Sequence, residues 1–310
     1  MNIHNILVAG NYEEEFQEKL PAKTPQSFRF KHLDEITEED LLWADAYVGF
    51  KPCRGFHFGE IKWVHSFNAG VNNFLEMEGW KEHDILLTRT VSTFGQRISE
   101  YCLSYVLREL QFHHYFGDRQ REKKWAPKTP QMVKDQTIVI FGTGEIGQEV
   151  AKVFSSFGAA VFGVSHSGRQ KEYFQKVTDT SSAGTLTAQA DWIISTLPLT
   201  SETSKLFNRS FFNNLNGAAF INVGRGHTVD EQALIEALNN SRVRYAVLDV
   251  LETEPLPENS ELWKRDDIVI TPHISAVTEL DEAVACFVES LKRIENNEVL
   301  PNRVDFLKGY

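Results

Sequence analysis

Short apolar runs alternate with polar, helix-like segments along the first part of the chain. Candidate strands lie at positions 6–9, 46–49, 61–66 and 85–88, and the segment from Glu13 to Leu20 is predicted to form a helix. Strands and helices that alternate in this way favour a parallel sheet with helices on both faces. We therefore expect an α/β domain at the start of the chain.

The pattern changes between Ser99 and Phe116, where apolar and aromatic residues recur at helical spacing. This spacing predicts one long amphipathic helix. A charged segment with prolines follows, and then a second series of strands is predicted at 137–141, 160–164, 192–196, 218–223, 245–248 and 268–271. Six such strands make a complete dinucleotide-binding sheet. A last helix is predicted from Glu279 to Glu295.

A glycine-rich turn, Gly142-Thr143-Gly144-Glu145-Ile146-Gly147, follows the first strand of the second series and precedes an amphipathic helix. In a dinucleotide site the first glycine permits the tight turn, the second lets the backbone approach a pyrophosphate, and the third lets the helix pack on the strand. The N–H groups at the start of the helix then bind the anion. We expect cofactor contacts at Gly142, Thr143, Gly144, Glu145 and Ile146.

These elements predict an α/β fold of two doubly wound parallel-sheet domains. We expect a Rossmann-type dinucleotide-binding domain, residues 98–278, inserted into a flavodoxin-like substrate-binding domain. The substrate-binding domain would consist of residues 1–97 and 279–310. The inserted position leaves the last helix free to return to the first domain.

The end of the second cofactor strand indicates which nicotinamide cofactor is preferred. An NAD site places Asp or Glu there to bind the ribose 2′-hydroxyl. This strand ends instead in Ser165, His166, Ser167, Gly168 and Arg169, with no carboxylate. Hydroxyl groups, an imidazole and a guanidinium suit a 2′-phosphate. We therefore expect NADP(H) to be preferred, with NAD(H) possible.

Three polar side chains at strand ends are candidate catalytic residues. Arg225 stands between two glycines after the strand 218–223, Glu254 follows the next strand, and His273 follows the last one. A guanidinium can hold a substrate carboxylate and polarise its carbonyl. An imidazole can donate a proton near neutral pH, and a neighbouring carboxylate favours the imidazolium. We predict that Arg225, Glu254 and His273 form the catalytic site.

These motifs resemble those of the D-isomer-specific 2-hydroxyacid dehydrogenase family. The matching segments are the glycine-rich turn, Leu197-Pro198-Leu199-Thr200, residues 222–230 and 249–257, Thr271-Pro272-His273, and Asn68 to Asn73 in the first domain. Phe50-Lys51-Pro52 and residues 165–169 are similar to the glyoxylate and hydroxypyruvate reductase branch. The chain departs from relatives that have a carboxylate after the second cofactor strand, an arginine at position 166, or an aspartate at position 72.

The resemblance implies further site residues. Backbone N–H groups at Ala69, Gly70 and Val71 would bind the substrate carboxylate, and Lys51 is a candidate for the substrate pocket. Asp249 would contact the nicotinamide side of the cofactor. The remaining cofactor contacts are expected at Leu197, Pro198, Thr203, Val223, Gly224, Arg225, Asp249, His273 and Ser275.

The resemblance also implies the reaction. Hydride would pass from NAD(P)H to the carbonyl carbon of a small 2-oxo acid, giving a D-2-hydroxy acid, and His273 would protonate the forming alkoxide. One alternative is an NAD-linked D-lactate-type dehydrogenase, for which the residue at position 165 is the discriminating feature. Another is a cofactor-sensing protein like the corepressors that resemble this family, with hydride transfer secondary.

The net charge of −11 argues against nucleic acid or an anionic membrane as a partner. The chain has three cysteines without a close pair, so we expect neither disulfides nor a metal site, and a cytoplasmic location. No signal peptide or membrane span is predicted at the start of the chain or elsewhere. The resemblance implies a homodimer, with the basic segment after Phe116 contributing to subunit contact.

Overall fold

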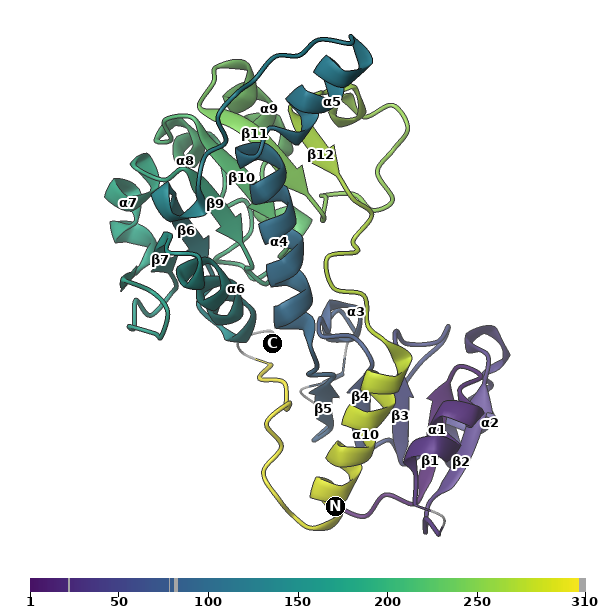
Figure 1. Ribbon diagram of the computed structural model, residues 1–310. Coiled ribbons are helices and arrows are strands. Elements are labelled where there is room, and N and C mark those ends of the chain that lie inside the picture. Colours follow the sequence, from purple (N-terminus) through teal and green to yellow (C-terminus); the bar gives the residue numbers. More distant parts are fainter. Residues whose placement is uncertain (22, 78, 81–82, 307–310) are drawn as a thin grey trace. The chain divides into compact units, whose positions relative to one another are not determined.

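The computed structural model describes residues 1–21, 23–77, 79–80 and 83–306 and divides into two compact units. The first unit consists of Met1–Ser92 and Thr278–Tyr310, and the second of Thr93–Val277 (Figure 1). The expected boundary after residue 97 therefore falls inside a helix, α4 (Phe94–Leu110). The boundary moves to Ser92 because the whole of this helix belongs to the second unit.

The first unit contains a parallel sheet of five strands in the order β2-β1-β3-β4-β5. The strands are β1 (Asn5–Ala9), β2 (Ser27–Lys31), β3 (Ala46–Gly49), β4 (Trp63–Ser66) and β5 (Leu86–Arg89). The helices are α1 (Glu13–Lys19), α2 (Glu38–Trp43), α3 (Asn72–Leu75) and α10 (Leu280–Glu295), with a short 3-10 turn at Leu33–Glu35. This strand order is the flavodoxin-like one.

Strand β2 was not predicted from the sequence. It is an edge strand in which Phe28 and Phe30 pack on one face of the sheet. On the opposite face Arg29 forms an ion pair with Asp40 at 2.9 Å. The strand therefore alternates between apolar and charged residues and lacks the continuous apolar run of the central strands.

Two apolar clusters cover the two faces of the first sheet. On one face, α1 and α10 contribute Phe16 and Phe287, and the ring of Phe287 stacks on Trp63 with centroids 5.0 Å apart. On the other face, α2 and α3 contribute Leu41 and Phe74. Helix α10, from the last part of the chain, thus completes the core of the first unit.

The second unit contains a parallel sheet of seven strands in the order β12-β11-β10-β9-β6-β7-β8. The strands are β6 (Thr137–Phe141), β7 (Ala160–Val164), β8 (Lys176–Thr178), β9 (Trp192–Ser195), β10 (Ala218–Asn222), β11 (Val243–Leu248) and β12 (Ile268–Ile270). The helices are α4, α5 (His113–Arg121), α6 (Glu145–Ser156), α7 (Gly184–Ala188), α8 (Arg209–Asn213) and α9 (Glu231–Asn239). Short 3-10 turns lie at Val133–Asp135, Thr180–Ser182, Gly226–Thr228 and Glu261–Lys264. The order is that of a Rossmann sheet with one strand more than predicted, the short edge strand β8.

The single helix predicted from Ser99 to Phe116 is wrong, because the structure has two helices there. Helix α4 ends at Leu110, and Phe112 adopts a left-handed backbone with φ of 56° before α5 begins. The buried side chains of α4 recur every four residues from Ile98 to Leu110, whereas α5 buries none. Packing against the sheet therefore ends at Leu110, and the chain turns away there.

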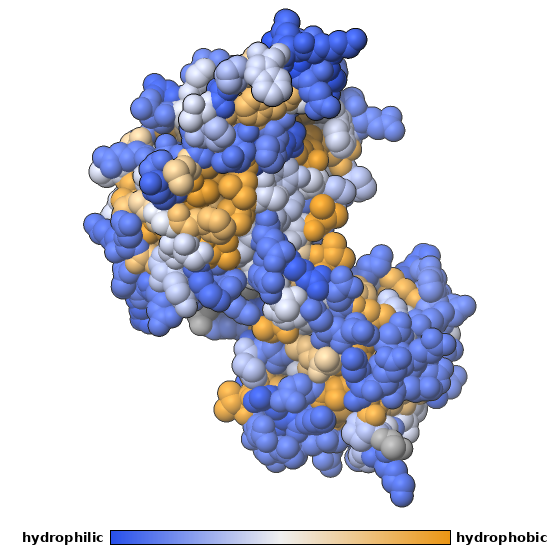
Figure 2. Space-filling view, viewed as in Figure 1, coloured by the Kyte–Doolittle hydropathy of each residue, from blue (hydrophilic) through white to orange (hydrophobic). Residues whose placement is uncertain are grey.

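Helices cover both faces of the second sheet. Residues of α4 and α6 pack on one face, and residues of α8 and α9 pack on the other. Polar residues cover most of the surface visible in Figure 2, and apolar residues appear there in smaller patches. Within the described residues, we find no helix with the length and apolar character needed to cross a membrane.

Candidate functional site

The predicted cofactor and catalytic residues of the second unit all follow the carboxyl ends of its parallel strands. Ligands bind at this edge in open α/β sheets. The glycine-rich turn follows β6, and Ser165 to Arg169 follow β7. Leu197, Pro198 and Thr203 follow β9; Val223, Gly224 and Arg225 follow β10; Asp249 and Glu254 follow β11; and His273 and Ser275 follow β12.

The glycine-rich turn has room for a ligand at one glycine and none at the other two. Gly142 has φ of 97°, a conformation that favours glycine. A Cβ atom on Gly147 would lie 1.8 Å from the carbonyl oxygen of Gly142, so only glycine lets α6 approach the strand. Gly144 caps α6 without a side-chain hydrogen bond, and a Cβ there would meet nothing within 4 Å. The N-terminus of α6 therefore has no side-chain cap and has open space beside Gly144.

The turn after β7 contains no carboxylate of its own, but it contacts one from another loop. The Nδ1 atom of His166 lies 3.0 Å from Oε2 of Glu202, and both side chains are mostly exposed. The backbone N–H of Ser165 donates to the carbonyl of Thr178 at 3.0 Å, whereas its buried Oγ has no partner in the described part of the chain. Arg169 is exposed. Glu202 was not predicted, because it lies 36 positions from His166 in a different loop.

The loop after β9 is held by its own hydrogen bonds. The hydroxyl of Thr203 donates to the carbonyl of Pro198 at 2.7 Å and accepts from the N–H of Thr200 at 2.8 Å. Gly224 packs against this loop so closely that a Cβ there would lie 2.4 Å from the carbonyl oxygen of Leu197. Thr203 thus stabilises the loop, and Gly224 brings the loops after β9 and β10 into contact.

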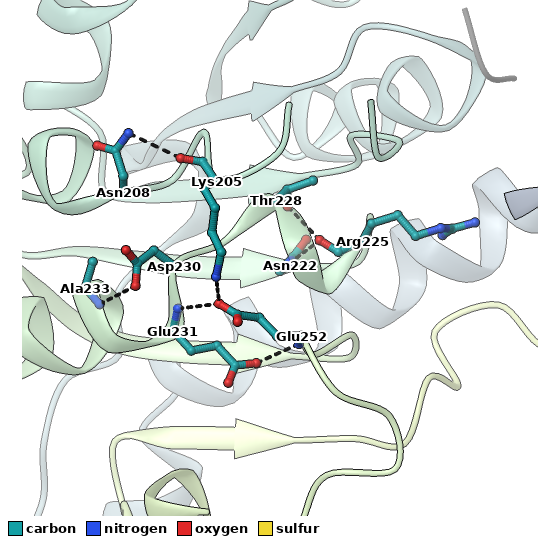
Figure 3. A network of polar contacts seen from close by, with 9 residues as sticks. All are labelled: Lys205, Asn208, Asn222, Arg225, Thr228, Asp230, Glu231, Ala233 and Glu252. Carbon is teal, nitrogen blue, oxygen red and sulfur yellow. Dashed lines mark hydrogen bonds and ion pairs between the residues drawn. The ribbon is translucent and has the colours of Figure 1, made fainter. Parts of the chain in front are cut away.

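The backbone of Arg225 is fixed from both sides. Its carbonyl accepts hydrogen bonds from Nδ2 of Asn222 at 3.1 Å and from Oγ1 of Thr228 at 2.6 Å. A Cβ on Gly226 would lie 1.9 Å from the carbonyl oxygen of Leu251, so the loop after β10 packs tightly on the loop after β11. In Figure 3 the guanidinium of Arg225 points away from the polar network around Glu252. The chain thus presents this side chain on a rigid support.

That network ties the loop after β11 to the start of α9 (Figure 3). The backbone N–H of Glu252 donates to Oε1 of Glu231 at 2.7 Å, and the N–H of Glu231 donates to Oε1 of Glu252 at 3.1 Å. Lys205 forms an ion pair with Glu252. Burial, and then the charge of Glu252, raise the pKa of Glu231. These residues support the loop that also contains Glu254.

Glu254 contacts one of the other two predicted catalytic residues, His273. Its Oε2 lies 2.9 Å from Nδ1 of His273, and its Oε1 accepts from the N–H of Leu251 at 3.0 Å. Burial lowers the pKa of Arg225 from its ordinary value, and the charge of Glu254 opposes this shift. The structure therefore joins Glu254 to His273, whose imidazole is half exposed, and the charge of Glu254 acts on Arg225.

Asp249 is buried and contacts the loop that holds His273. Its Oδ1 accepts from Oγ1 of Thr271 at 2.6 Å and from the N–H of Ile274 at 2.8 Å, and its Oδ2 accepts from the N–H of Ser275 at 2.8 Å. The N–H of His273 donates to the carbonyl of Asp249 at 2.9 Å. Asp249 was expected to contact the cofactor; in the structure its carboxylate is occupied by this loop.

In the first unit, the predicted substrate residues follow β3 and β4, which are neighbours in the sheet. The carbonyl of Lys51 accepts from the hydroxyl of Tyr47 at 2.9 Å. Nδ2 of Asn68 donates to the carbonyl of Phe50 at 3.1 Å, which joins the two turns. Ala69 and Gly70 lie in the second turn, and Val71 caps α3 without a side-chain hydrogen bond.

Comparison with known proteins places this arrangement in a family. Residues 103–275 match the family model described as D-isomer specific 2-hydroxyacid dehydrogenase, NAD binding domain. The chain is 33% identical over 258 residues to glyoxylate/hydroxypyruvate reductase A of Serratia proteamaculans, covering 81% of this chain and 82% of that relative.

Two solved structures share the fold over almost the whole chain. One is a D-isomer specific 2-hydroxyacid dehydrogenase from Xanthobacter autotrophicus in complex with NADPH and MES, with 29% identity, full coverage of both chains and a TM-score of 0.89. The other is an NADPH-dependent glyoxylate/hydroxypyruvate reductase from Sinorhizobium meliloti in complex with NADP and sulfate. It has 28% identity and a TM-score of 0.88, and the match covers 99% of this chain and 100% of that one. The chain therefore belongs to the D-isomer-specific 2-hydroxyacid dehydrogenase family and is similar within it to the glyoxylate/hydroxypyruvate reductase A branch.

Proposed function

We propose that this protein reduces a small 2-oxo acid, of the glyoxylate or hydroxypyruvate type, to the D-2-hydroxy acid, with NADPH as the preferred cofactor. The observation that best supports this reaction is the hydrogen bond between His273 and Glu254 at the ligand-binding edge of a Rossmann sheet, where Arg225 follows the neighbouring strand β10. The names of the relatives suggest the substrate class.

The residues present fit a dinucleotide. Helix α6 has an uncapped N-terminus, open space at Gly144 and the exposed residue Glu145 beside it, so its first N–H groups can receive a pyrophosphate. The neighbouring residues Gly142, Thr143 and Ile146 would line the same turn. When bound, the reduced nicotinamide supplies the hydride for the carbonyl carbon.

In this proposal, His273 donates a proton to the forming alkoxide. Glu254 accepts from one ring nitrogen at Nδ1, so Nε2 is the atom that faces the substrate with its proton. The imidazolium is the form of the ring that carries this proton and can act as an acid. The N–H of Leu251 fixes the other oxygen of Glu254 and so orients the pair.

Arg225 would bind the substrate carboxylate and polarise the carbonyl with its planar fork. In the first unit, backbone N–H groups at Ala69, Gly70 and Val71 would also bind the carboxylate, and Lys51 would contact the remainder of the substrate. Leu197, Pro198, Thr203, Val223, Gly224 and Ser275 would line the cofactor through the loops that contain them. Asp249 would support the nicotinamide side of the cofactor site by holding the loop that contains Ile274 and Ser275.

The preference for NADPH would depend on the turn after β7. The unpartnered hydroxyl of Ser165, the hydroxyl of Ser167 and the exposed guanidinium of Arg169 are donors suited to a 2′-phosphate. His166, which lies 3.0 Å from Glu202, would border the same phosphate. The two similar solved structures whose descriptions include NADPH or NADP support the same preference.

We also propose that the protein is a homodimer. Trp125 is 99% exposed, and the preceding helix α5 buries none of its residues. An exposed aromatic residue beside an uncovered helix suits an interface with a second copy of the chain. Light scattering coupled to size-exclusion chromatography would give the mass of a dimer for the native protein and of a smaller species for Trp125→Ala.

A panel of glyoxylate, hydroxypyruvate and pyruvate assayed with NADPH and NADH tests the reaction. We expect the highest kcat/KM with glyoxylate or hydroxypyruvate and NADPH, and the loss of turnover by roughly 10²- to 10⁴-fold in His273→Ala with cofactor affinity retained. Native turnover in His273→Ala, or the absence of reduction with every 2-oxo acid, would refute the proposal.

A further inference from the structure

A line of polar groups connects helix α4 to the loop that contains His273. The hydroxyl of Tyr101 lies 2.6 Å from Oγ1 of Thr271, and Oγ1 of Thr271 lies 2.6 Å from Oδ1 of Asp249. An ionised carboxylate only accepts hydrogen bonds, so the Thr271 hydroxyl donates to Asp249 and accepts from Tyr101. The direction of both bonds is thereby fixed.

Asp249, the last residue of this series, holds the backbone of His273 and of the two residues that follow it. The carboxylate of Asp249 accepts from the N–H groups of Ile274 and Ser275, and its carbonyl accepts from the N–H of His273. Three consecutive N–H groups therefore converge on one residue. Asp249 itself is 1% exposed and lies directly after β11, a strand paired on both sides, so it offers a fixed point of attachment.

His273 needs this support because its backbone is left-handed, with φ of 55°. Residues other than glycine rarely adopt this conformation, and they keep it only where the surroundings impose it. Relaxation to the common conformation would turn the ring away from Glu254, from which it is 2.9 Å distant in the structure. The orientation of the imidazole thus depends on the contacts of residues 271–275.

Tyr101, the first residue of this series of hydrogen bonds, lies on a helix that is held firmly in place. Helix α4 is anchored on the sheet by the buried residues Ile98, Cys102 and Val106, and a Cβ on Gly95 would lie 3.0 Å from Cβ of Glu149 in α6. Helix α4 is therefore held closely against α6. A tyrosine on the packed side of α4 is long enough to place its hydroxyl at the strand end where Thr271 lies.

We propose that Tyr101 is a positioning residue for the reaction, which acts through Thr271 and Asp249 to hold His273 in the orientation required for proton transfer. This inference rests on the proposed role of His273. Tyr101 itself contacts neither His273 nor Glu254 through any of these bonds. It acts by keeping the Thr271 hydroxyl directed at Asp249.

Kinetics of Tyr101→Phe with glyoxylate and NADPH test the proposal. Loss of one such hydrogen bond corresponds to roughly a 3- to 10-fold change, so we expect kcat to fall by this factor. The KM for glyoxylate and the Kd for NADPH should remain within about 2-fold of the native values. Thr271→Val should reduce kcat at least as much, and Thr271→Ser, which keeps the hydroxyl, should restore most of it.

A matched control is Tyr105→Phe, one turn further along α4, whose ring contacts that of Tyr101 with centroids 4.8 Å apart. This variant should retain native kcat. Hydrogen exchange of the full protein gives a second readout that needs no activity: the amides of Ile274 and Ser275 should lose protection in Tyr101→Phe and keep it in Tyr105→Phe.

The possible failures are distinguishable. If His273→Ala keeps native turnover, the proposed function fails, whatever Tyr101→Phe does. If His273→Ala is inactive while Tyr101→Phe has native kcat and native exchange at Ile274 and Ser275, only the positioning role is overturned. Equal losses of kcat in Tyr101→Phe and Tyr105→Phe would also overturn it, since they would show a general effect of packing in α4.

Discussion

The Nδ1 atom of His273 lies 2.9 Å from Oε2 of Glu254, and the two residues follow neighbouring strands of one parallel sheet. Each side chain is partly accessible. Buried Asp249 holds the backbone of the histidine loop, and the N–H of Leu251 donates to the side chain of Glu254. The pair is therefore open to a substrate and fixed in geometry at the same time.

Glu254→Gln should slow reduction without abolishing it. The glutamine keeps the size of the side chain and removes the charged partner of the His273 ring. We expect kcat/KM for glyoxylate to fall roughly 10-fold or more, the effect of losing one charge-assisted hydrogen bond. Steady-state kinetics with NADPH measure this, and a native kcat/KM would argue against the pairing.

Arg225→Lys should impair the use of substrate more than the binding of cofactor. Lysine keeps the positive charge and loses the planar fork that contacts carboxylate and carbonyl together. We expect kcat/KM for glyoxylate to fall roughly 10- to 100-fold, with little change in the Kd for NADPH. An equal loss with an aldehyde that lacks the carboxylate would show that Arg225 has a different role.

Gly144→Ala and Gly147→Ala should separate cofactor binding from stability. A Cβ at position 147 would lie 1.8 Å from the Gly142 carbonyl, so this variant should lose on the order of 1–3 kcal/mol of folding free energy. A Cβ at position 144 meets nothing within 4 Å and should cost about 1 kcal/mol or less, but it would occupy space meant for the pyrophosphate. Thermal unfolding and NADPH titration of both variants test this, and unchanged NADPH affinity in Gly144→Ala would exclude the assigned site.

Ser165→Asp should reverse the cofactor preference. The native protein should prefer NADPH by at least ~10-fold in kcat/KM, the low end for a single charge-assisted contact. Aspartate at this position would repel the 2′-phosphate and accept from the 2′-hydroxyl of NADH. Steady-state kinetics with both cofactors decide the matter, and a native protein that prefers NADH would contradict the assignment.

His65 should make the first unit sensitive to acid. Its ring is fully buried, its Nδ1 contacts Oγ1 of Thr88 at 2.8 Å, and burial lowers its pKa to about 3 from an ordinary value of 6.5. Between these two values the unfolded chain binds a proton that the folded chain excludes, so stability falls as the pH falls through this window. The loss should be on the order of 4–5 kcal/mol at most.

Urea unfolding at several pH values checks the role of His65. His65→Phe should flatten the dependence of the unfolding free energy on pH below neutrality, whereas His113→Gln, at an exposed position, should leave it unchanged. The same slope in His65→Phe as in the native protein would assign the acid sensitivity to other groups.

The sequence predicted the central strands of both sheets well because these strands are continuous apolar runs. It did not predict β2 and β8, which lie at sheet edges and bury less of their surface. It also merged α4 and α5, because helical spacing of aromatic residues continues past Leu110 although the burial stops there. The local pattern of apolar residues does not show at which residue a helix stops packing against the core.

Strand-end positions led us to predict Arg225, Glu254 and His273 as a group, since parallel strands end at one edge. Tyr101 was predicted only as part of the amphipathic helix from Ser99 to Phe116, and its partner Thr271 lies 170 positions away. The one local signal was a polar hydroxyl in that helix. Glu202 was missed for a related reason, because nothing in the chain near it indicates the approach of His166.

The first unit is assembled from both ends of the chain. Helix α10 supplies Phe287, which stacks on Trp63. In the segment after α10, the N–H of Val304 donates to the carbonyl of Leu87 at 2.9 Å. During synthesis the ribosome releases residues 93–277, a complete sheet with its helices, before these partners exist. Until then the face of the sheet formed by residues 1–92 on which α10 packs has only α1 to cover it. The unit that is translated first is therefore the last to finish folding.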